Sequence, residues 1–295
     1  MRKVKIITDS CSDLNGELMA KYDIDYARMC TVYNGESTPA LLTRTPEEFH
    51  EFYEIMRAGN RILTTQVPVE EFITVFTKYL EEGYDIVYIA CAVKQSGSVN
   101  TAQVVSRDLL KKYPDASIFC IDSMNASLGE GLLAIQAAML VKEGLSAQEV
   151  NDRILAIRKN VNEFVTVHSL DALRRCGRVK ASAAFFGNLM GIKPILIADA
   201  DGTQVPIKKA KGRQASFREI VALLKEAILN PEEQTVYVAH ADCSQAEVDV
   251  LVSLVKQEIP CKDVVVTYIG PIIGASIGPE AVGIWAMGKE VTFRG

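Results

Sequence analysis

Short apolar runs that alternate with longer segments of helical spacing restrict the fold of this chain more than any other feature. Strands joined by helices form βα units, and successive units build a mostly parallel sheet. In the first half of the chain we expect strands at Val4–Thr8, Ile24–Thr31, Ile86–Ala92 and Ser117–Ile121. We expect helices at Asp13–Lys21, Pro46–Met56, Val69–Leu80, Ser98–Lys111, Leu128–Val141 and Ser146–Lys159. The pattern predicts an α/β fold whose first sheet is mostly parallel and flanked by helices.

A second set of strand-like runs begins near Val161, which we take as a domain boundary. The length of 295 residues suits two domains at roughly 150 residues each. Asp199-Ala200-Asp201-Gly202 is a hairpin turn pattern, so the second domain contains an antiparallel pair. We therefore predict α/β domains at residues 1–160 and 161–295, the second with a mixed sheet and helices. Its expected strands are Glu163–His168, Pro194–Asp199, Gln204–Ile207, Thr235–Ala239 and Val264–Tyr268.

The composition restricts location and partners. Hydrophobic residues make up 48% of the chain and charged ones 23%, which is enough for a sizeable core. The net charge of −5 argues against nucleic acid as a partner. No apolar run reaches the ~18 residues of a membrane span, and the N-terminus turns acidic at Asp9, too soon for a secretory signal. We expect a cytoplasmic protein without an integral membrane segment, and transient membrane contact stays open.

Cysteine and histidine usage argues against a metal centre. The seven cysteines are scattered, none forms a Cys-x-x-Cys pair, and only three histidines are present. We therefore expect neither a zinc site nor a disulfide framework. We interpret Cys91 and Cys120, which lie in strand-like runs, as small core residues. No metal or other cofactor is expected.

Ser96-Gly97-Ser98 lies between a strand-like run and a helical segment, where an anion site can form. Open N–H groups at a helix start, the helix dipole and a serine hydroxyl all favour negative charge there. The glycine allows a ligand close to the backbone. No lysine follows as in a phosphate-binding P-loop, so a carboxylate fits better than a phosphate chain. A helix cap with no ligand is the alternative interpretation.

Three further loops rich in hydroxyl groups stand at strand ends or helix starts: residues 9–13, 64–68 and 122–127. Ligands of open parallel sheets bind at the carboxyl ends of the strands. Ser, Thr and Asp also cap helices, so each loop alone has a structural explanation. Together they indicate a shared pocket. We interpret Asp13 as a helix cap or first-turn acid.

Two glycine motifs suggest other activities. Residues 129–134 match the dinucleotide pattern G-x-G-x-x-A, but the acid expected about 20 residues later falls inside a predicted helix. We interpret those glycines as permitting close helix packing. Residues 274–278 match the G-x-S-x-G elbow of hydrolases between a strand and a helix, yet no Asp or His follows Ser276. We interpret Ser276 as a hydroxyl donor. A serine hydrolase that borrows His168 or His240 remains an alternative; otherwise we interpret both histidines as structural.

A basic cluster at residues 174–180 contains Arg174, Arg175, Arg178 and Lys180. Such a run is commonly a solvated face, but a glycine-containing loop also suits contact with an acidic partner or a phosphate. The cluster leaves open a phosphotransferase component that binds a small hydroxylated substrate.

The ordered motifs resemble the DegV family over essentially the whole chain. Residues 4–14 resemble its opening Thr-Asp-Ser-x-Ser-Asp-Leu block, and residues 96–102 its Ser-Gly-Thr-Tyr-Gln-Ser-Ala block. The other matching blocks are residues 64–68, 121–129, 173–179, 191–196 and 270–279. Val67-Pro68 departs from the family's Pro-Ser, and Ser276 stands where many members carry a histidine.

The resemblance implies a two-domain α/β protein that binds one long-chain fatty acid in an apolar tunnel. It also implies a non-catalytic subunit of a fatty-acid kinase: a separate kinase subunit would phosphorylate the bound carboxylate, and the acyl phosphate would feed phospholipid synthesis. The carboxylate would be held by Ser96, Gly97, Thr64 or Thr65, and Ser276. Arg178 and Arg213 would face the kinase or the phosphate.

Overall fold

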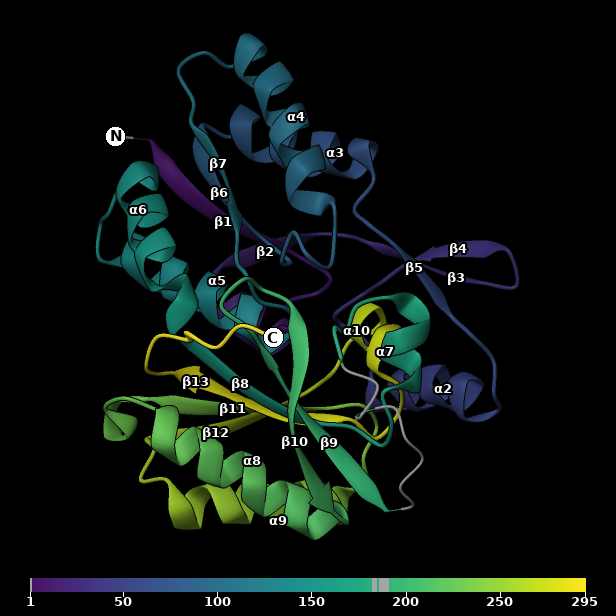
Figure 1. The fold of residues 1–295 in the computed structure, drawn as a ribbon. Coiled ribbons are helices and arrows are strands. Elements are labelled where there is room, and N and C mark those ends of the chain that lie inside the picture. Colours follow the sequence, from purple (N-terminus) through teal and green to yellow (C-terminus); the bar gives the residue numbers. More distant parts are fainter. Residues whose placement is uncertain (1, 182–184, 186–190) are drawn as a thin grey trace.

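Four parallel strands in the order β2-β1-β6-β7 form a sheet from the first half of the chain (Figure 1). The structure is a computed structural model in which residues 2–181, 185 and 191–295 are described. The strands are β1 (Lys3–Asp9), β2 (Ile24–Ala27), β6 (Tyr84–Ala90) and β7 (Ile118–Asp122). Helices α3 (Val69–Glu81) and α4 (Ser98–Lys112) cover one face, and α1 (Gly16–Tyr22), α5 (Leu128–Lys142) and α6 (Ala147–Ile157) cover the other. Both faces are buried, which explains the continuous apolar runs of β1 and β6.

A six-stranded mixed sheet, in the order β10-β9-β8-β13-β11-β12, forms from the second half. Its strands are β8 (Val161–Thr166), β9 (Ile192–Ala198), β10 (Gln204–Lys211), β11 (Thr235–His240), β12 (Asp263–Tyr268) and β13 (Val282–Met287). Helices α8 (Arg213–Ala227) and α9 (Gln245–Glu258) cover one face. The predicted hairpin is confirmed, since β9 and β10 pair antiparallel around a turn in which Gly202 has φ +79°. The predicted fold class is confirmed as well.

A small antiparallel sheet, in the order β4-β3-β5, corrects one sequence expectation. The run Ile24–Thr31 is not one strand: β2 ends at Ala27, and the chain enters β3 at Cys30. Between them, the backbone N–H of Met29 donates to Ser10 Oγ (3.1 Å), which turns the chain away from the parallel sheet. The elements are β3 (Cys30–Tyr33), β4 (Glu36–Pro39), β5 (Leu63–Thr65) and α2 (Pro46–Arg57).

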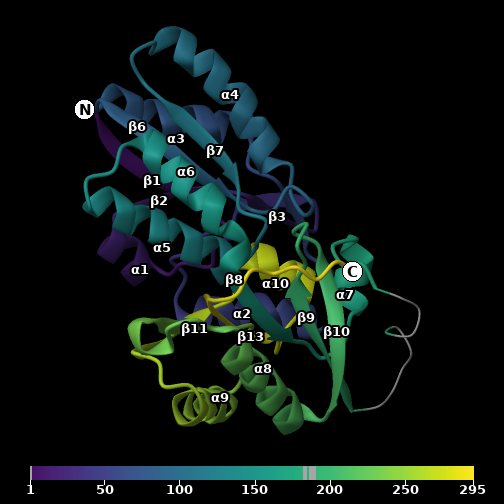
Figure 2. The same cartoon turned by 60° about the vertical axis from the view of Figure 1, so that its left-hand side comes forward.

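Helix α5 lies between the two large sheets (Figure 2). It is apolar on nearly all sides, as expected of a helix buried all round. A Cβ on Gly131 would lie 2.6 Å from the carbonyl oxygen of Ser12, so the glycine allows α5 to approach the loop after β1. This close packing confirms the interpretation given to the glycine motif at 129–134.

The strands of the two large sheets come from residues 3–122 and 161–287. One hydrophobic cluster nevertheless contains residues of both sheets, with Ile6 and Trp285 among them. Division into domains at residue 160 therefore stays a prediction. None of the helices that the structure describes combines the length and apolar character needed to cross a bilayer.

Candidate ligand cavity

A cavity lies between the carboxyl ends of the parallel sheet and the inner face of the mixed sheet. Its volume is about 980 Å³ when the solvent-filled space at its open mouth is included. Two short helices complete its wall, α7 (Asp171–Cys176) and α10 (Pro271–Ile277). The apolar lining consists of Cys11, Met29, Cys91, Ala126, Val165, Leu173, Leu196, Ile269, Ile272, Ile273, Ile277 and Trp285. Mostly apolar walls with a few polar groups are typical of small-molecule sites.

Every residue that the sequence predicted for the carboxylate lines this cavity. The set comprises Thr64, Thr65, Ser96, Gly97 and Ser276, and Arg178 lines it too. Gln66, from the loop at 64–68 that the sequence predicted for the pocket, also contributes a polar group. So do Gln95, Glu163 and Gln204, and sequence reasoning missed these three. Apart from Glu163, these polar residues are partly or largely exposed, which places them toward the mouth.

The loop before α4 is organised by two serine hydroxyls. Ser96 Oγ and Ser98 Oγ are 3.0 Å apart, and Ser96 Oγ also accepts from the backbone N–H of Ser98 (3.3 Å). Ser98 is fully buried, and its Oγ accepts from the N–H of Val67 (3.2 Å). Gly97 is the N-cap residue of α4, with φ −83°. Ser96 is the hydroxyl of this pair that reaches the cavity, since it lines the cavity and Ser98 does not.

The segment after β5 is bound to the same helix start. Gln66 Nε2 donates to Thr101 Oγ1 on α4 (2.8 Å), and Val67 bonds to Ser98 as described. Thr64 and Thr65 end β5, where they pair with Thr31 and Cys30 of β3. Two segments that are thirty residues apart in sequence thus form one polar rim.

Ser276 lies in the last turn of α10, not between a strand and a helix, so that part of the elbow interpretation is wrong. Its Oγ donates to the carbonyl of Ile272 (3.4 Å), a common bond for a serine within a helix. A Cβ on Gly274 would clash with the ring of Tyr53 on α2, which gives that glycine a packing role. Among the described residues, no serine or threonine hydroxyl of the cavity bonds a histidine, so the geometry shows no nucleophile–base pair.

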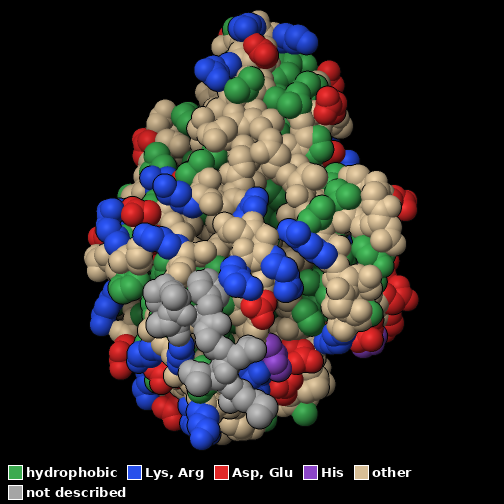
Figure 3. Space-filling model, turned by 45° about the vertical axis from the view of Figure 1, so that its right-hand side comes forward, with side chains coloured by type: hydrophobic (Ala, Val, Ile, Leu, Met, Phe, Trp, Pro, Cys, Tyr) green, Lys and Arg blue, Asp and Glu red, His purple; other side chains and the backbone are tan. Residues whose placement is uncertain are grey.

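Arg178 lies at the mouth of the cavity. Its Nε donates to the carbonyl of Gln95 (3.2 Å), and another guanidinium nitrogen donates to the carbonyl of Cys176. Together with Arg61 and Arg175, Arg178 also lines a second hollow that shares Thr64 and Ser276 with the cavity. Lys and Arg side chains gather on this face of the molecule (Figure 3). The mouth is therefore basic, although the chain as a whole is acidic.

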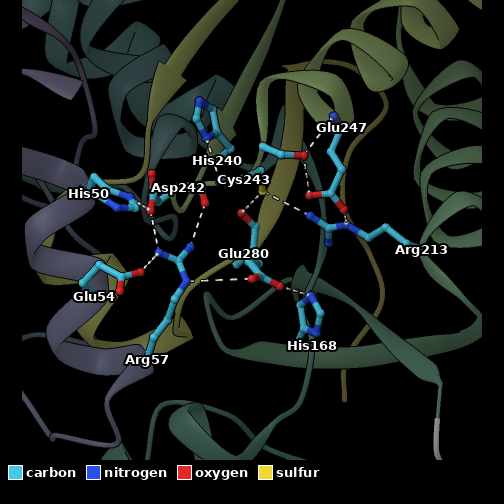
Figure 4. A network of polar contacts seen from close by, with 12 residues as sticks. His50, Glu54, Arg57, His168, Arg213, His240, Asp242, Cys243, Glu247 and Glu280 are labelled. Carbon is cyan, nitrogen blue, oxygen red and sulfur yellow. Dashed lines mark hydrogen bonds and ion pairs between the residues drawn. The ribbon is translucent and has the colours of Figure 1, made fainter. Parts of the chain in front are cut away.

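Arg213 does not line the cavity. Its Nε forms an ion pair with Glu247 Oε1 (2.9 Å), and it donates to Cys243 Sγ (3.1 Å) (Figure 4). The predicted pair of arginines therefore separates, with Arg178 at the mouth and Arg213 at the start of α8. The predicted contact of Arg213 with a partner stays a prediction.

The two histidines proposed as borrowed bases both have other partners. His168 contacts Glu280 (2.6 Å) and Lys193 (2.7 Å), within the polar network that Figure 4 shows. His240 is buried, and its Nδ1 accepts from the N–H of Cys243 (3.2 Å). Burial lowers the pKa of His240 to about 4, so its imidazole is neutral near pH 7. These contacts fit the structural interpretation of both residues.

Glu163 introduces a carboxyl group into the otherwise apolar inner wall. It is buried on β8, and its oxygens accept from Gln204 Nε2 (2.6 Å) and Trp285 Nε1 (3.0 Å). Burial raises the pKa of Glu163, against the opposing effect of these two hydrogen bonds. The sequence offered no signal for it, because an isolated Glu in a strand-like run belongs to no motif.

Asp13 is neither a helix cap nor a first-turn acid, so that interpretation is wrong. Asn15 caps α1 instead, by accepting from the N–H of Leu18 (2.9 Å). Asp13 is buried, and it accepts from Ser127 Oγ and from the N–H of Gly270 (2.8 Å). Burial raises its pKa to about 7. Asp13 thus joins three distant segments beside the cavity.

The fold and the cavity together define a two-sheet α/β protein with an apolar chamber that opens through a polar, basic mouth. A family model described as "Uncharacterised protein, DegV family" matches residues 3–289. A DegV domain-containing protein of Clostridium perfringens is 34% identical over 290 residues, which are 98% of this chain and 98% of that protein. The chain belongs to the DegV family.

Two solved structures from Thermotoga maritima share the whole architecture. One is the crystal structure of a DegV lipid-binding protein, with a TM-score of 0.84 and 30% identity, covering 98% of this chain and all of that one. The other, a protein whose structure reveals a fatty acid binding function, has a TM-score of 0.84 and 29% identity, with the same coverage. The predicted family resemblance is confirmed.

Proposed function

We propose that this protein binds one long-chain fatty acid, with its hydrocarbon tail in the apolar chamber and its carboxylate at the mouth. The observation that carries the proposal is a single cavity in which apolar side chains form the wall and Ser96, Thr64 and Ser276 line the opening. Each buried CH₂ contributes about 0.8 kcal/mol, so the tail supplies most of the affinity. The hydroxyl groups supply orientation.

The charges indicate which way the ligand lies. The inner wall is mostly apolar, so a ligand carboxylate placed there would lose its hydration without gaining a positively charged partner. The mouth contains Arg178 and the N-terminus of α4, and both favour negative charge. A fatty acid therefore enters tail first and leaves its carboxylate near Ser96 and Gly97.

The relatives support the ligand class. The two Thermotoga maritima proteins, which are 29–30% identical over nearly the whole chain, are a lipid-binding protein and one with a fatty acid binding function. The chamber of this chain is too apolar for a small hydroxylated substrate, which weakens the phosphotransferase alternative. The missing histidine partner of Ser276 weakens the hydrolase alternative.

We further propose that the protein is a cytoplasmic carrier without a catalytic centre of its own. It would present the bound carboxylate to a separate fatty-acid kinase subunit for acyl-phosphate formation, in the service of phospholipid synthesis. Arg61, Arg175 and Arg178 around the mouth support this role, because a basic rim suits an acidic partner surface and a transferred phosphate. No cofactor is required for it.

Titration with oleate and with methyl oleate tests the proposed function. The delipidated protein should bind oleate tightly and methyl oleate more weakly, because the ester lacks the charge that the mouth attracts. Ser96→Ala should bind oleate about 10-fold more weakly, as expected for a lost hydrogen bond to a charged group.

Ser106→Ala is the matched control, since Ser106 lies on the same helix and bonds the carbonyl of Ala102 instead of lining the cavity. It should bind oleate like the unaltered protein. Equal oleate affinity of the unaltered protein and Ser96→Ala would argue against a carboxylate at this loop. No saturable oleate binding by the unaltered protein would refute the proposed function as a whole.

A further inference from the structure

Two thiols and a carboxyl group meet at the carboxyl ends of β1 and β6, away from the mouth of the cavity. Cys11 follows β1, Cys91 follows β6, and Glu130 comes from the first turn of α5. One ligand atom from each of the three lies within 4.8 Å of the other two. Their exposed fractions are 2%, 1% and 0%, so all three side chains are buried.

Glu130 has one unused carboxylate oxygen. Its Oε1 accepts from Thr8 Oγ1 (2.5 Å) and from the N–H of Asp9 (3.3 Å). Its Oε2 is buried and has no hydrogen-bond partner among the described residues. A buried oxygen without a partner costs about 1–3 kcal/mol, and such groups are uncommon in proteins. An ion bound beside the thiols would satisfy it.

The surroundings of the three residues supply support and a route of entry. The N–H groups of Cys11 and Cys91 both donate to Asp9, at 2.9 and 3.3 Å, which fixes the two cysteine backbones relative to each other. Met29 Sδ lies 3.5 Å from Cys11 Sγ and adds a second kind of sulfur donor. Cys11, Met29 and Cys91 all line the cavity, so a small ion can reach them from the mouth.

The donor set selects the ion. Thiolate sulfur favours soft or borderline metals, and zinc accepts both cysteine sulfur and carboxylate oxygen in a four-coordinate site. Two thiolates and a carboxylate carry three negative charges in a buried place, which a divalent cation offsets better than a monovalent one. Calcium and magnesium prefer all-oxygen ligands.

We propose that Cys11, Cys91 and Glu130 bind one zinc-class divalent cation, with the Met29 thioether next to Cys11. On binding, two metal–sulfur bonds and one metal–oxygen bond form and replace water ligands of the ion. The two thiol protons and the carboxyl proton of Glu130 pass to solvent, and no atom changes its oxidation state. The sequence expectation of no metal rested on the absence of a Cys-x-x-Cys pair. This site instead joins cysteines eighty residues apart, which only the parallel pairing of β1 with β6 brings together.

Titration of the delipidated full chain with Zn²⁺ alone, with the thiols kept reduced, tests the proposal. One equivalent should bind, and Cys11→Ser and Cys91→Ser should each weaken binding by more than about 100-fold, since even loss of an outer-shell partner costs 10–100-fold. Glu130→Gln should weaken it as well. Cys120→Ser is the matched control: its thiol lies on β7 beside Ser106, outside the group, and Zn²⁺ binding should not change.

Two measurements on the unaltered protein remove dependence on variants that fail to fold. Co²⁺ in place of Zn²⁺ should give a thiolate-to-metal absorption band at one equivalent. Bound Zn²⁺ should protect Cys11 and Cys91, but not Cys261, from alkylation, as read by peptide mass spectrometry. The proposal is overturned if the unaltered protein binds no Zn²⁺ saturably, or if protection falls on other cysteines. It is also overturned if Cys11→Ser and Cys91→Ser bind Zn²⁺ as the control does.

Discussion

The inner wall of the cavity and its mouth are built from different parts of the molecule. The wall consists of core side chains such as Val165, Leu196 and Trp285, which also hold the mixed sheet against α5. The mouth consists of partly exposed side chains such as Ser96 and Arg178, carried by loops and by the ends of short elements. Changes in the wall therefore act on both folding and affinity, whereas changes at the mouth act on orientation and exchange.

This difference also explains how the acids are distributed. Acidic groups at the wall and beside it, such as Glu163 and Asp13, are buried, and burial raises their pKa values. The mouth carries arginines, and on the adjacent surface Asp242 and Glu280 form ion pairs with Arg57 (Figure 4). A carboxylate ligand would likewise lose its hydration in the interior, whereas the arginines attract it to the opening.

The largest expected effect comes from placing a charge in the wall. Ile273→Asp should weaken oleate binding by more than about 100-fold, because an unpaired carboxylate beside the hydrocarbon tail costs several kcal/mol. Ile273 is only partly buried, so the variant can be checked for folding by circular dichroism. Ile73→Asp, at an exposed position of α3, is the control and should bind oleate normally. Full oleate affinity in Ile273→Asp would show that the hydrocarbon tail does not lie against this part of the wall.

The second effect concerns the buried acid of the wall. Because the pKa of Glu163 is raised in the folded state, its contribution to stability is greatest below the ordinary value of 4.5 and is lost as the pH rises above it. Glu163→Gln removes this loss. The free energy of unfolding of Glu163→Gln in urea, minus that of the unaltered protein, should therefore increase by about 1.4 kcal/mol per pH unit as the pH rises above 4.5 toward the raised pKa of Glu163.

Glu232→Gln, at an exposed position, is the control for this pH series and should follow the unaltered protein. A pH-independent difference between Glu163→Gln and the unaltered protein would mean that Glu163 is charged within the wall. The claim that acids in the wall are uncharged, whereas the groups at the mouth are charged, would then be wrong.

Tail length gives a smaller, graded effect. Saturated fatty acids shortened one carbon at a time should lose about 4-fold in affinity per CH₂, as long as the tail stays within the apolar wall. Ser96→Ala should shift the whole series by a constant factor and leave its slope unchanged. Calorimetric titration measures both quantities. A changed slope in Ser96→Ala would show that the mouth and the wall are not independent.

The smallest effect on binding is expected at the basic rim. Arg178→Gln should change oleate affinity by less than about 3-fold, because exposed charges contribute little. It should still slow acyl-phosphate formation when ATP and a fatty-acid kinase subunit are added. Lys111→Gln, on the exposed end of α4, is the control. Unchanged phosphorylation in Arg178→Gln would remove that residue from the partner surface.

The sequence predicted those elements whose residues are buried in a regular pattern. Strands β1, β6 and β7 and the helices between them follow from apolar runs and helical spacing. Strand β13 was missed although Val282–Met287 is a buried apolar run like that of β6, so its local signal went unused. Its place between β8 and β11 could not be read from the sequence, because the pairing joins distant parts of the chain. The turn Asn34-Gly35 between β3 and β4, with φ of +51° and +81°, was a hairpin signal that went unused.

The residues of the candidate site also fall into those that the sequence could predict and those that it could not. Thr64, Ser96 and Ser276 could be singled out because hydroxyl groups at strand ends and the family motifs marked them. Glu163 and Gln204 could not, because isolated polar residues in strands become a pair only when β8 and β10 approach in the fold. Cys91 was interpreted as a small core residue and Cys11 was given no role, since only the register of β1 and β6 makes them neighbours.

Native mass spectrometry of the protein as purified tests the central claim most directly. A fatty-acid carrier should retain its ligand, so the spectrum should show a mass increment equal to one long-chain fatty acid, which organic extraction removes and added oleate restores. A protein that carries no such mass, and acquires none after incubation with oleate, would contradict the account.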